Sequence, residues 1–430
     1  MDGSTVAVIG LGYVGAPVLE RCLAAEYSVI GADIEEDNVN DVQAGINPLT
    51  GDPLPSPAMV SSEATTRNRT AVEAANIIVI TVPTPVDDRK RPDFTALKSV
   101  MRDVAAGAQG GELVIVESTI PPGTTESVLK PILEEEGFEC GEDIYLAHSP
   151  ERIDPNNESW PLEAIPRVVG AWSDKGRKQA IEFYDTILES DVYPASAIEI
   201  AEASKILENT FRDVNIAFVN EIARTFDNFG IDIHEVIDLA ATKPYGFMPF
   251  YPGAGVGGHC IPVDPYLLLN GNKYRDIDQE FLRKARSVNE QMPRYLVEQT
   301  KNLAADLQLG SDRSALILGV SFKSDIEDVR GSPYFPIRDG LVDAGFSVET
   351  YDPWVPEQST VDAPYINADL VILVTSHEVF KSLEIDRLAE EGVKGIVDGR
   401  DQFNREEILD YGMAYFGIGK GKYLLENPIS

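Results

Sequence analysis

The hexapeptide Gly10-Leu11-Gly12-Tyr13-Val14-Gly15 lies between a short apolar run, Val6–Ile9, and a stretch of helical periodicity. A second strand is expected at Ser28–Asp33, which completes a βαβ unit. Glycines spaced as G-x-G-x-x-G provide the tight turn, the close approach of backbone to a pyrophosphate, and the close packing of helix on strand. The hexapeptide therefore predicts a dinucleotide site.

Asp33 ends the second expected strand, about twenty residues beyond the glycines, where an acidic side chain meets the ribose of a bound dinucleotide. Its carboxylate can accept hydrogen bonds from ribose hydroxyls and repels a 2′-phosphate, so NAD is favoured over NADP. The alternative, an ordinary glycine turn followed by a solvated aspartate, fits the βαβ context less well.

Apolar runs separated by helical or loop stretches recur in the first and last parts of the chain. Such runs are typical of parallel strands that are buried on both faces. The expected strands are Ile77–Val82, Leu113–Glu117 and Ile144–Ala147 in the first part, and Ala315–Val320, Ser347–Asp352, Leu370–Thr375 and Gly395–Asp398 in the last part.

The middle of the chain has a different periodicity. From Ala197 to about Leu239 apolar residues recur at helical spacing, with no glycine or proline before Gly230, and more helix is expected to about Leu309. We therefore expect two Rossmann-like, doubly wound parallel-sheet domains, residues 1–196 and 311–430, joined by a central helical domain, residues 197–310. The helical domain is a candidate dimer surface, and the α/β domains leave a cleft for ligands.

The composition sets outer limits on function. With 71 Asp plus Glu against 36 Lys plus Arg, the net charge of −35 is spread along the whole chain. Nucleic acid is excluded as a partner because binding phosphates needs the opposite sign. A diffuse excess of carboxylates is typical of halophilic surfaces, where salt screens self-repulsion. The hydrophobic content of 43% indicates a globular protein.

Membrane, metal and disulfide chemistry are not expected. No apolar run is long enough to cross a bilayer and no secretory signal opens the chain, so we expect a soluble, cytoplasmic protein. Three scattered cysteines give no disulfide framework, and the four histidines lack metal-ligand spacing.

The stretch Pro252–Pro265 holds the densest group of unusual residues, with four glycines ahead of Cys260 and Asp264 four residues after it. The glycines permit positive φ and bring backbone N–H groups close to a ligand, so substrate can reach the thiol. Asp264 can orient a water or a lysine beside it. The alternative is a glycine-rich loop with a buried, structural cysteine.

Lys205 and Asn209 lie four residues apart on the expected long helix, so both project from one face into a cleft, unless they belong to its solvated side. Thr119 and Glu151 each follow an expected strand, at the sheet edge where α/β proteins collect functional residues. Either of these two residues can instead cap a helix.

Taken together, these residues resemble the UDP-sugar 6-dehydrogenase family, which includes UDP-glucose, UDP-N-acetylglucosamine and UDP-N-acetylmannosamine dehydrogenases. The resemblance covers nearly the whole chain. Its motifs, in order, are the Gly10–Gly15 hexapeptide, Thr81–Pro85, Glu117–Glu126, Ser149–Arg152, Lys205–Asn209, Gly257–Asp264, Phe322-Lys323 with Asp328 and Arg330, and Asp398–Arg400.

The resemblance implies a homodimeric, NAD-dependent oxidoreductase that oxidises a sugar C6 alcohol to a carboxylate. Cys260 would attack the intermediate aldehyde, and the resulting thiohemiacetal would be oxidised to a thioester that water hydrolyses. Lys205 and Asn209 would stabilise the developing alkoxide. Asp264 and Thr119 would bind or activate water, and Glu151 would support hydrolysis of the thioester.

The resemblance also implies two sets of binding residues. The cofactor would meet Gly10, Gly12, Tyr13, Val14, Gly15, Asp33, Val82, Pro83, Thr84, Thr119 and Arg330. The UDP-sugar would meet Glu151, Lys205, Asn209, Phe250, Tyr251, Gly253, Gly257, Lys323 and Arg400, the last two gripping the UDP moiety.

The segments Arg212–Phe218 and Ala241–Tyr251 resemble N-acetylhexosamine members, the first including the mannosamine type and the second the glucosamine type. UDP-glucose enzymes usually carry a lysine where this chain has Val263. We therefore expect UDP-ManNAc or UDP-GlcNAc as the substrate, with the C2 configuration open, and a uronic acid that serves polysaccharide biosynthesis. The alternatives are a UDP-glucose 6-dehydrogenase, a β-hydroxyacid-type dehydrogenase, which has no use for a cysteine loop, and a sugar-nucleotide sensor without chemistry.

Overall fold

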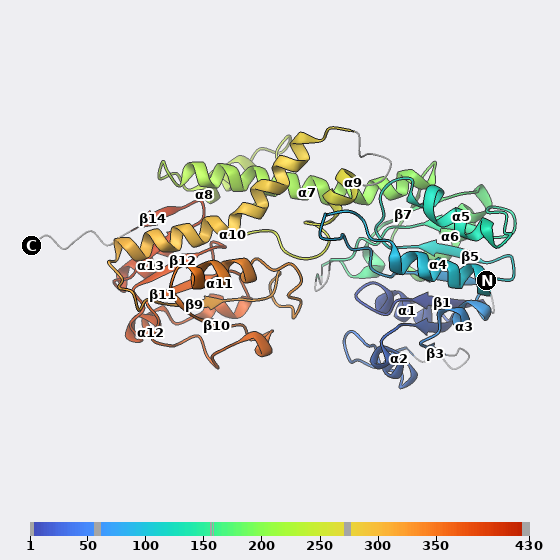
Figure 1. Cartoon of the computed structure of the whole chain (residues 1–430), viewed down its shortest axis with the longest axis horizontal. Helices are drawn as coiled ribbons and strands as arrows, with labels where there is room; N and C mark the ends of the chain where they lie inside the picture. Colours follow the sequence, from blue (N-terminus) through green and yellow to red (C-terminus); the bar gives the residue numbers. More distant parts are fainter. Residues whose placement is uncertain (1–3, 56–61, 155–156, 158, 271–276, 424–430) are drawn as a thin grey trace, which may run out of the picture. The chain divides into compact units, whose positions relative to one another are not determined.

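The computed structural model describes residues 4–55, 62–154, 157, 159–270 and 277–423 (Figure 1). They form two compact units. Unit 1 contains Met1–Glu208 and Tyr266–Ile277, and unit 2 contains Asn209–Pro265 and Asp278–Ser430. The division into three domains stays a prediction.

Unit 1 is built on an eight-stranded sheet in the order β3-β2-β1-β4-β5-β6-β7-β8. Neighbouring strands are parallel except β6 and β7, which are antiparallel. The strands are β1 (Thr5–Ile9), β2 (Ser28–Ala32), β3 (Ser62–Thr65), β4 (Ile77–Ile80), β5 (Leu113–Val116), β6 (Tyr145–His148), β7 (Arg167–Ala171) and β8 (Val192–Pro194), and the helices are α1 (Gly15–Ala24), α2 (Glu36–Gln43), α3 (Asn68–Glu73), α4 (Thr95–Gly107), α5 (Lys130–Glu135) and α6 (Asp174–Ile187).

Helices cover both faces of this sheet, which explains why its strands are apolar without alternation. Val6 and Val8 of β1 pack with side chains of α1 and α6. Ala7 and Ile9 point to the other face and pack with α3 and α4. The expected doubly wound sheet is confirmed for this part of the chain.

Unit 2 contains a six-stranded sheet in the order β10-β9-β11-β12-β13-β14, parallel except for β14. The side chains of α10 and α11 pack on one face of it and those of α12 and α13 on the other, and Figure 1 shows α10 and α12 on opposite sides of the sheet. The elements are β9 (Ser314–Leu318), β10 (Ser347–Tyr351), β11 (Leu370–Leu373), β12 (Gly395–Asp398), β13 (Ala414–Gly417), β14 (Gly421–Tyr423), α8 (Ile233–Ala241), α10 (Glu280–Asp306), α11 (Tyr334–Asp343), α12 (Ile385–Glu390) and α13 (Arg405–Asp410).

The long helix α7 (Ile198–Phe226) is shorter than its periodicity indicates. The chain turns at Gly230, where φ is +64°, and α8 begins after Asp232, whose carboxylate accepts the N–H groups of His234 and Glu235. The apolar pattern continues through this turn because α7 and α8 bury side chains in the same core. Residues 242–251, where more helix is expected, form a loop that continues into the glycine-rich stretch before Cys260.

The two sheets share one local arrangement at the end of their first strand. Gly10 and Gly319 both have positive φ, +97° and +90°. The N–H that follows each glycine donates to an aspartate at the end of the next strand, from Leu11 to Asp33 and from Val320 to Asp352, both at 2.6 Å. Asp352 also meets the imidazole of His377 at 3.0 Å, and both are fully buried.

Candidate active site

The turn Gly10–Gly15 between β1 and α1, here called the glycine corner, has little room for added side-chain atoms. The N–H of Gly10 donates to Ala32 O at 2.7 Å, and the hydroxyl of Thr81 donates to Gly10 O at 2.7 Å. A Cβ on Gly15 would lie 1.7 Å from Gly10 O, whereas a Cβ on Gly12 would meet nothing within 4 Å. Gly15 is therefore required by the fold, and Gly12 leaves space that a ligand can use.

Asp33 occupies the expected position at the end of β2. Its Oδ2 accepts the N–H of Leu11 at 2.6 Å, and its Oδ1 accepts the N–H of Glu35 at 2.9 Å. Each carboxylate oxygen keeps capacity for another donor, such as a ribose hydroxyl. Because no side chain caps the first turn of α1, that helix end can bind an anion. These features fit a dinucleotide.

Two loops meet at the C-terminal edge of the sheet, after β4 and after β5. The Ser118 hydroxyl donates to Val82 O and the Thr84 hydroxyl donates to Thr119 O, both at 2.6 Å. The structure therefore brings together the predicted residues Val82, Pro83 and Thr84 with Thr119, which is half-buried.

Glu151 is buried beneath this edge and binds Arg167, the first residue of β7. Arg167 also lies 3.5 Å from Glu117, which follows β5, and the hydroxyl of Tyr184 in α6 donates to Glu117 at 2.6 Å. Burial raises the pKa of Glu117 to about 8, against the influence of Arg167. Burial opposes ionisation of Glu151 as well, but Arg167, Glu117 and the Arg152 N–H together outweigh it and lower the pKa of Glu151.

No role was assigned from the sequence to Glu117, Arg167 or Tyr184. One signal was available for the first two, because Glu117 directly follows a wholly apolar strand and Arg167 begins an otherwise apolar one. Such a charge has to be paired if it is buried.

Lys205 and Asn209 are both buried on one face of α7, as their spacing predicts. The amide of Asn209 donates to the carboxylate of Asp264 at 2.5 Å. Asp264 is the first residue of α9 (Asp264–Asn270), and its N–H donates to Cys260 O at 2.8 Å. The Cys260 thiol is half-buried and lies 3.6 Å from His259 Nε2.

These predicted catalytic residues are divided between the units. Asn209, Cys260 and Asp264 belong to unit 2, and Thr119, Glu151 and Lys205 belong to unit 1. Their assembly into one site stays a prediction.

The glycine-rich loop is held by buried polar groups of unit 2. The N–H of Gly253 donates to Asn220 Oδ1 at 3.0 Å, and Asn220 donates to Asn289 at 2.9 Å. The Arg400 guanidinium lies against Gly253, where a Cβ would come within 2.4 Å of it, and donates to Gly255 O at 3.4 Å. Burial lowers the pKa of Arg400 to about 10.

The second half of the loop packs on the segment after β9. A Cβ on Gly257 would lie 2.6 Å from Phe322, and the N–H of Gly258 donates to Arg330 O at 3.0 Å. Lys323, next to Phe322, is half-buried, and its carbonyl accepts the Ser321 hydroxyl. The loop that precedes Cys260 therefore contacts the segment that carries Lys323.

The remaining predicted binding residues have protein partners. Tyr251 donates to Asp238 at 2.7 Å, and Phe250 packs edge-on against Phe211. The guanidinium of Arg330 pairs with Asp328. Arg330 belongs to unit 2, whereas the glycine corner belongs to unit 1. Cofactor contact by Arg330 therefore stays a prediction.

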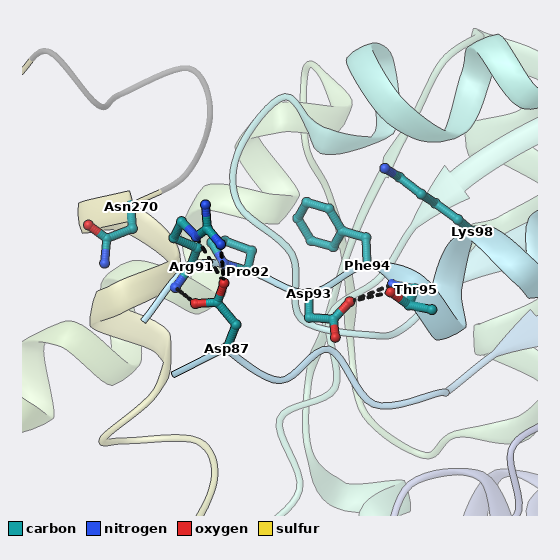
Figure 2. Close-up of a pocket in the computed structure, with 8 residues that line it drawn as sticks. All are labelled: Asp87, Arg91, Pro92, Asp93, Phe94, Thr95, Lys98 and Asn270. Atoms are coloured by element: carbon teal, nitrogen blue, oxygen red, sulfur yellow. Dashed lines mark hydrogen bonds and ion pairs between the residues drawn. The ribbon is translucent and has the colours of Figure 1, made fainter. Parts of the chain in front are cut away.

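A polar hollow of about 360 Å³ lies beside the loop after β4 (Figure 2). Asp87 binds Arg91, Asp93 binds Thr95, and Asn270 of α9 donates to Lys90 O at 2.6 Å. None of the predicted site residues lines this hollow.

Within the described ranges, no group of three or more His, Cys, Asp or Glu side chains could hold a metal ion. In the same part of the chain, no helix is long and apolar enough to cross a membrane.

Three family models match the chain in order. Residues 4–188 match the NAD binding domain of the UDP-glucose/GDP-mannose dehydrogenase family, residues 199–291 its central domain, and residues 316–405 its UDP binding domain.

Individual proteins match over nearly the whole length. UDP-N-acetyl-D-mannosamine dehydrogenase of Methanocaldococcus jannaschii is 32% identical, over 98% of this chain and 97% of its own. UDP-N-acetyl-D-glucosamine 6-dehydrogenase of Pseudomonas aeruginosa is 33% identical, over 91% of this chain and 95% of its own. The solved structure of UDP-D-ManNAc dehydrogenase from Pyrococcus horikoshii is 32% identical, with a TM-score of 0.87, and the alignment covers 97% and 99% of the two chains.

The glycine corner yields a matched pair of substitutions. Gly15→Ala should lower the free energy of unfolding by about 1–3 kcal/mol, because the added Cβ overlaps Gly10 O. Gly12→Ala should leave it unchanged and weaken NAD binding by roughly tenfold or more, because its Cβ enters the ligand space. Denaturant unfolding and calorimetric titration with NAD measure both effects. Unchanged NAD affinity in Gly12→Ala would contradict this placement of the pyrophosphate.

Proposed function

The chain belongs to the UDP-glucose/GDP-mannose dehydrogenase family, and we propose that within it the protein is a UDP-N-acetylhexosamine 6-dehydrogenase that uses Cys260 as a covalent nucleophile. The observation that carries this proposal is the turn at Cys260. Its carbonyl accepts the N–H of Asp264, whose carboxylate in turn accepts the amide of Asn209, so three residues of the expected chemistry are tied together.

The residues of unit 1 hold the cofactor in this proposal. The open space at Gly12 admits the pyrophosphate and Asp33 receives the ribose hydroxyls. NAD, when bound, supplies the hydride acceptor for each of two oxidations.

The cysteine makes the second oxidation possible. Once the C6 alcohol is an aldehyde, the Cys260 thiolate adds to C6 and the carbonyl oxygen becomes the oxygen of a thiohemiacetal. Loss of a hydride and a proton from that carbon and oxygen gives a thioester. Water then adds to C6, the carbon–sulfur bond breaks, and the thiol is regenerated beside a carboxylic acid.

The other predicted catalytic residues have separate roles in this scheme. The ammonium of Lys205 and the amide of Asn209 stabilise negative charge on the C6 oxygen. Asp264 and Thr119 orient or activate water, and Glu151, which its Arg167 partner keeps ionised, supports hydrolysis of the thioester.

Lys323 and Arg400 bind the UDP moiety. Burial lowers the pKa of Arg400 to about 10, so an anion beside its guanidinium would stabilise the charged form. Both residues adjoin the glycine-rich loop, because Arg400 lies over Gly253 and Lys323 follows the Phe322 ring that covers Gly258. The loop therefore links the UDP-binding residues to the cysteine.

An N-acetylated hexosamine is the favoured substrate. The relatives from M. jannaschii and P. aeruginosa are named for UDP-N-acetyl-D-mannosamine and UDP-N-acetyl-D-glucosamine. Val263 stands where UDP-glucose enzymes usually have lysine. UDP-glucose is the second candidate, because the family name includes it.

A homodimer is proposed from the exposed face of α7. Ile200, Leu207, Phe211 and Phe218 are 47–70% exposed, and their spacings of seven, four and seven residues place them on one stripe. Exposed Val236 and Leu239 of α8 add to the apolar surface. Such stripes are typical of helices that pack against a second chain.

We also propose that the enzyme is cytoplasmic and halophilic, and that its uronic acid serves polysaccharide biosynthesis. The net charge of −35 supports the adaptation to salt.

The stoichiometry of NADH tests the mechanism. With UDP-GlcNAc, UDP-ManNAc or UDP-glucose supplied in turn, the preferred substrate should give two NADH per acid. Cys260→Ser should lower turnover by roughly 10³-fold or more, because a hydroxyl is a much weaker nucleophile than a thiolate. It should still bind NAD, and Cys140→Ala should keep normal turnover. One NADH per sugar, or acid formed at the normal rate by Cys260→Ser, would rule the mechanism out.

Light scattering tests the dimer. Phe218→Glu should convert the protein to monomers, because it places a charge within the apolar stripe. Val342→Glu, at a similarly exposed apolar position on α11, should leave the assembly unchanged. A wild-type monomer at micromolar concentration would refute the proposal.

Salt should stabilise the fold. We expect the thermal midpoint to rise steadily from about 0.1 M to molar KCl, because the Debye length shrinks from about 10 Å to about 3 Å and relieves repulsion between carboxylates. Sucrose at the same osmolality is the control, because it stabilises proteins by being excluded from their surface without screening charge. A maximum of stability at low salt would show that the acidic surface has another cause.

A further inference from the structure

Three charged side chains are buried together at the C-terminal edge of the sheet in unit 1. Glu117 and Arg167 are each 1% exposed and Glu151 is 6% exposed. They come from the ends of three neighbouring strands, β5, β6 and β7. If all three were ionised, the cluster would carry one uncompensated negative charge away from water, which is strongly unfavourable. One bound proton makes the cluster neutral.

Glu151 has the contacts of an ionised carboxylate. Its Oε1 accepts the backbone N–H groups of Arg152 and Ile153, both at 2.6 Å, and its Oε2 receives the Arg167 guanidinium at close range. Three donors, one of them cationic, favour the charged form of an acid.

Glu117 has weaker contacts. Its Oε1 accepts one phenol hydrogen from Tyr184, while its Oε2 lies 3.5 Å from Arg167, beyond a good charged hydrogen bond. The neighbouring carboxyl group of Glu151 raises the pKa of Glu117, whereas Glu117 lowers the pKa of Glu151. A proton on Glu117 would give it an O–H donor for the carboxylate of Glu151.

We propose that Glu117 carries this proton in the working enzyme and donates it to Glu151, which makes Glu117 a positioning residue that keeps Glu151 ionised and fixed in orientation. The proposal rests on the role in hydrolysis proposed above for Glu151. An ionised Glu151 can take a proton from attacking water, which a protonated one cannot.

The surroundings of Glu117 agree with this arrangement. The groups that face it are Arg167 from β7, Glu151, Tyr184 from α6 and Cys22 from α1. Burial raises the pKa of both Tyr184 and Cys22, so neither adds a charge near neutral pH. With the pKa of Glu117 raised to about 8, the proton stays bound below that pH and is lost as the pH rises through it.

Infrared difference spectroscopy of the full chain without substrate or NAD tests the proposal. The wild type should show the carbonyl stretch of a buried, protonated carboxyl that disappears with a midpoint near pH 8. Glu117→Gln should lack this signal. Glu202→Gln is the matched control, because Glu202 is another buried carboxyl, with its pKa raised to about 7, and its removal should leave the Glu117 signal intact.

A second variant tests the charge balance of the cluster. In Glu151→Gln only one carboxyl faces Arg167, so Glu117 should ionise and its signal should disappear across the neutral range. A signal that persists in Glu117→Gln but is lost in Glu151→Gln would place the proton on Glu151 and overturn the proposal. The absence of any carboxyl signal assigned to this pair in the wild type would overturn it as well. Because no turnover is measured, a failure here is distinct from a failure of the dehydrogenase mechanism.

Discussion

Burial of both faces of each sheet is the constraint on which the rest of the structure depends. Helices cover the strands on both sides, so positions such as Val8 and Ile78 have no room for a polar group. In central strands such as β4 and β5, polar side chains are therefore confined to positions at or beyond the strand ends, as Glu117 shows. The C-terminal edge of the sheet thus concentrates charged groups in a small volume with little water, and such groups have to neutralise one another.

The loop that carries the cysteine contains no helix or strand, so regular backbone hydrogen bonds do not determine its shape. Its shape is imposed by side chains of unit 2. Asn220 binds the N–H of Gly253, Arg400 lies where a side chain on Gly253 would be, and Phe322 fills the space beside Gly257. A glycine-rich sequence usually suggests flexibility, but here the glycines let three bulky side chains approach the backbone.

The fold and part of the candidate site could be predicted from the sequence, because the signals are local. The glycine corner, most of the strands and the shared face of Lys205 and Asn209 depend on spacings of a few residues. The pairing of Glu117 and Glu151 with Arg167 depends on the order of β5, β6 and an antiparallel β7, which apolar runs do not reveal. The end of α7 at Phe226 was missed because α8 continues the same apolar pattern.

The repeated corner has a consequence for the order of events in turnover. In unit 1 Asp33 is partly accessible, whereas its counterpart Asp352 in unit 2 is 1% exposed and faces buried His377. Among the residues that the structure describes, one such corner thus has an accessible carboxylate, and the two hydride removals proposed above would use it in turn. Under the proposed mechanism, spent cofactor leaves and fresh cofactor enters while the sugar is half oxidised. A covalent bond to Cys260 prevents release of the aldehyde during that exchange, so the thiol serves as a retention device as well as a nucleophile.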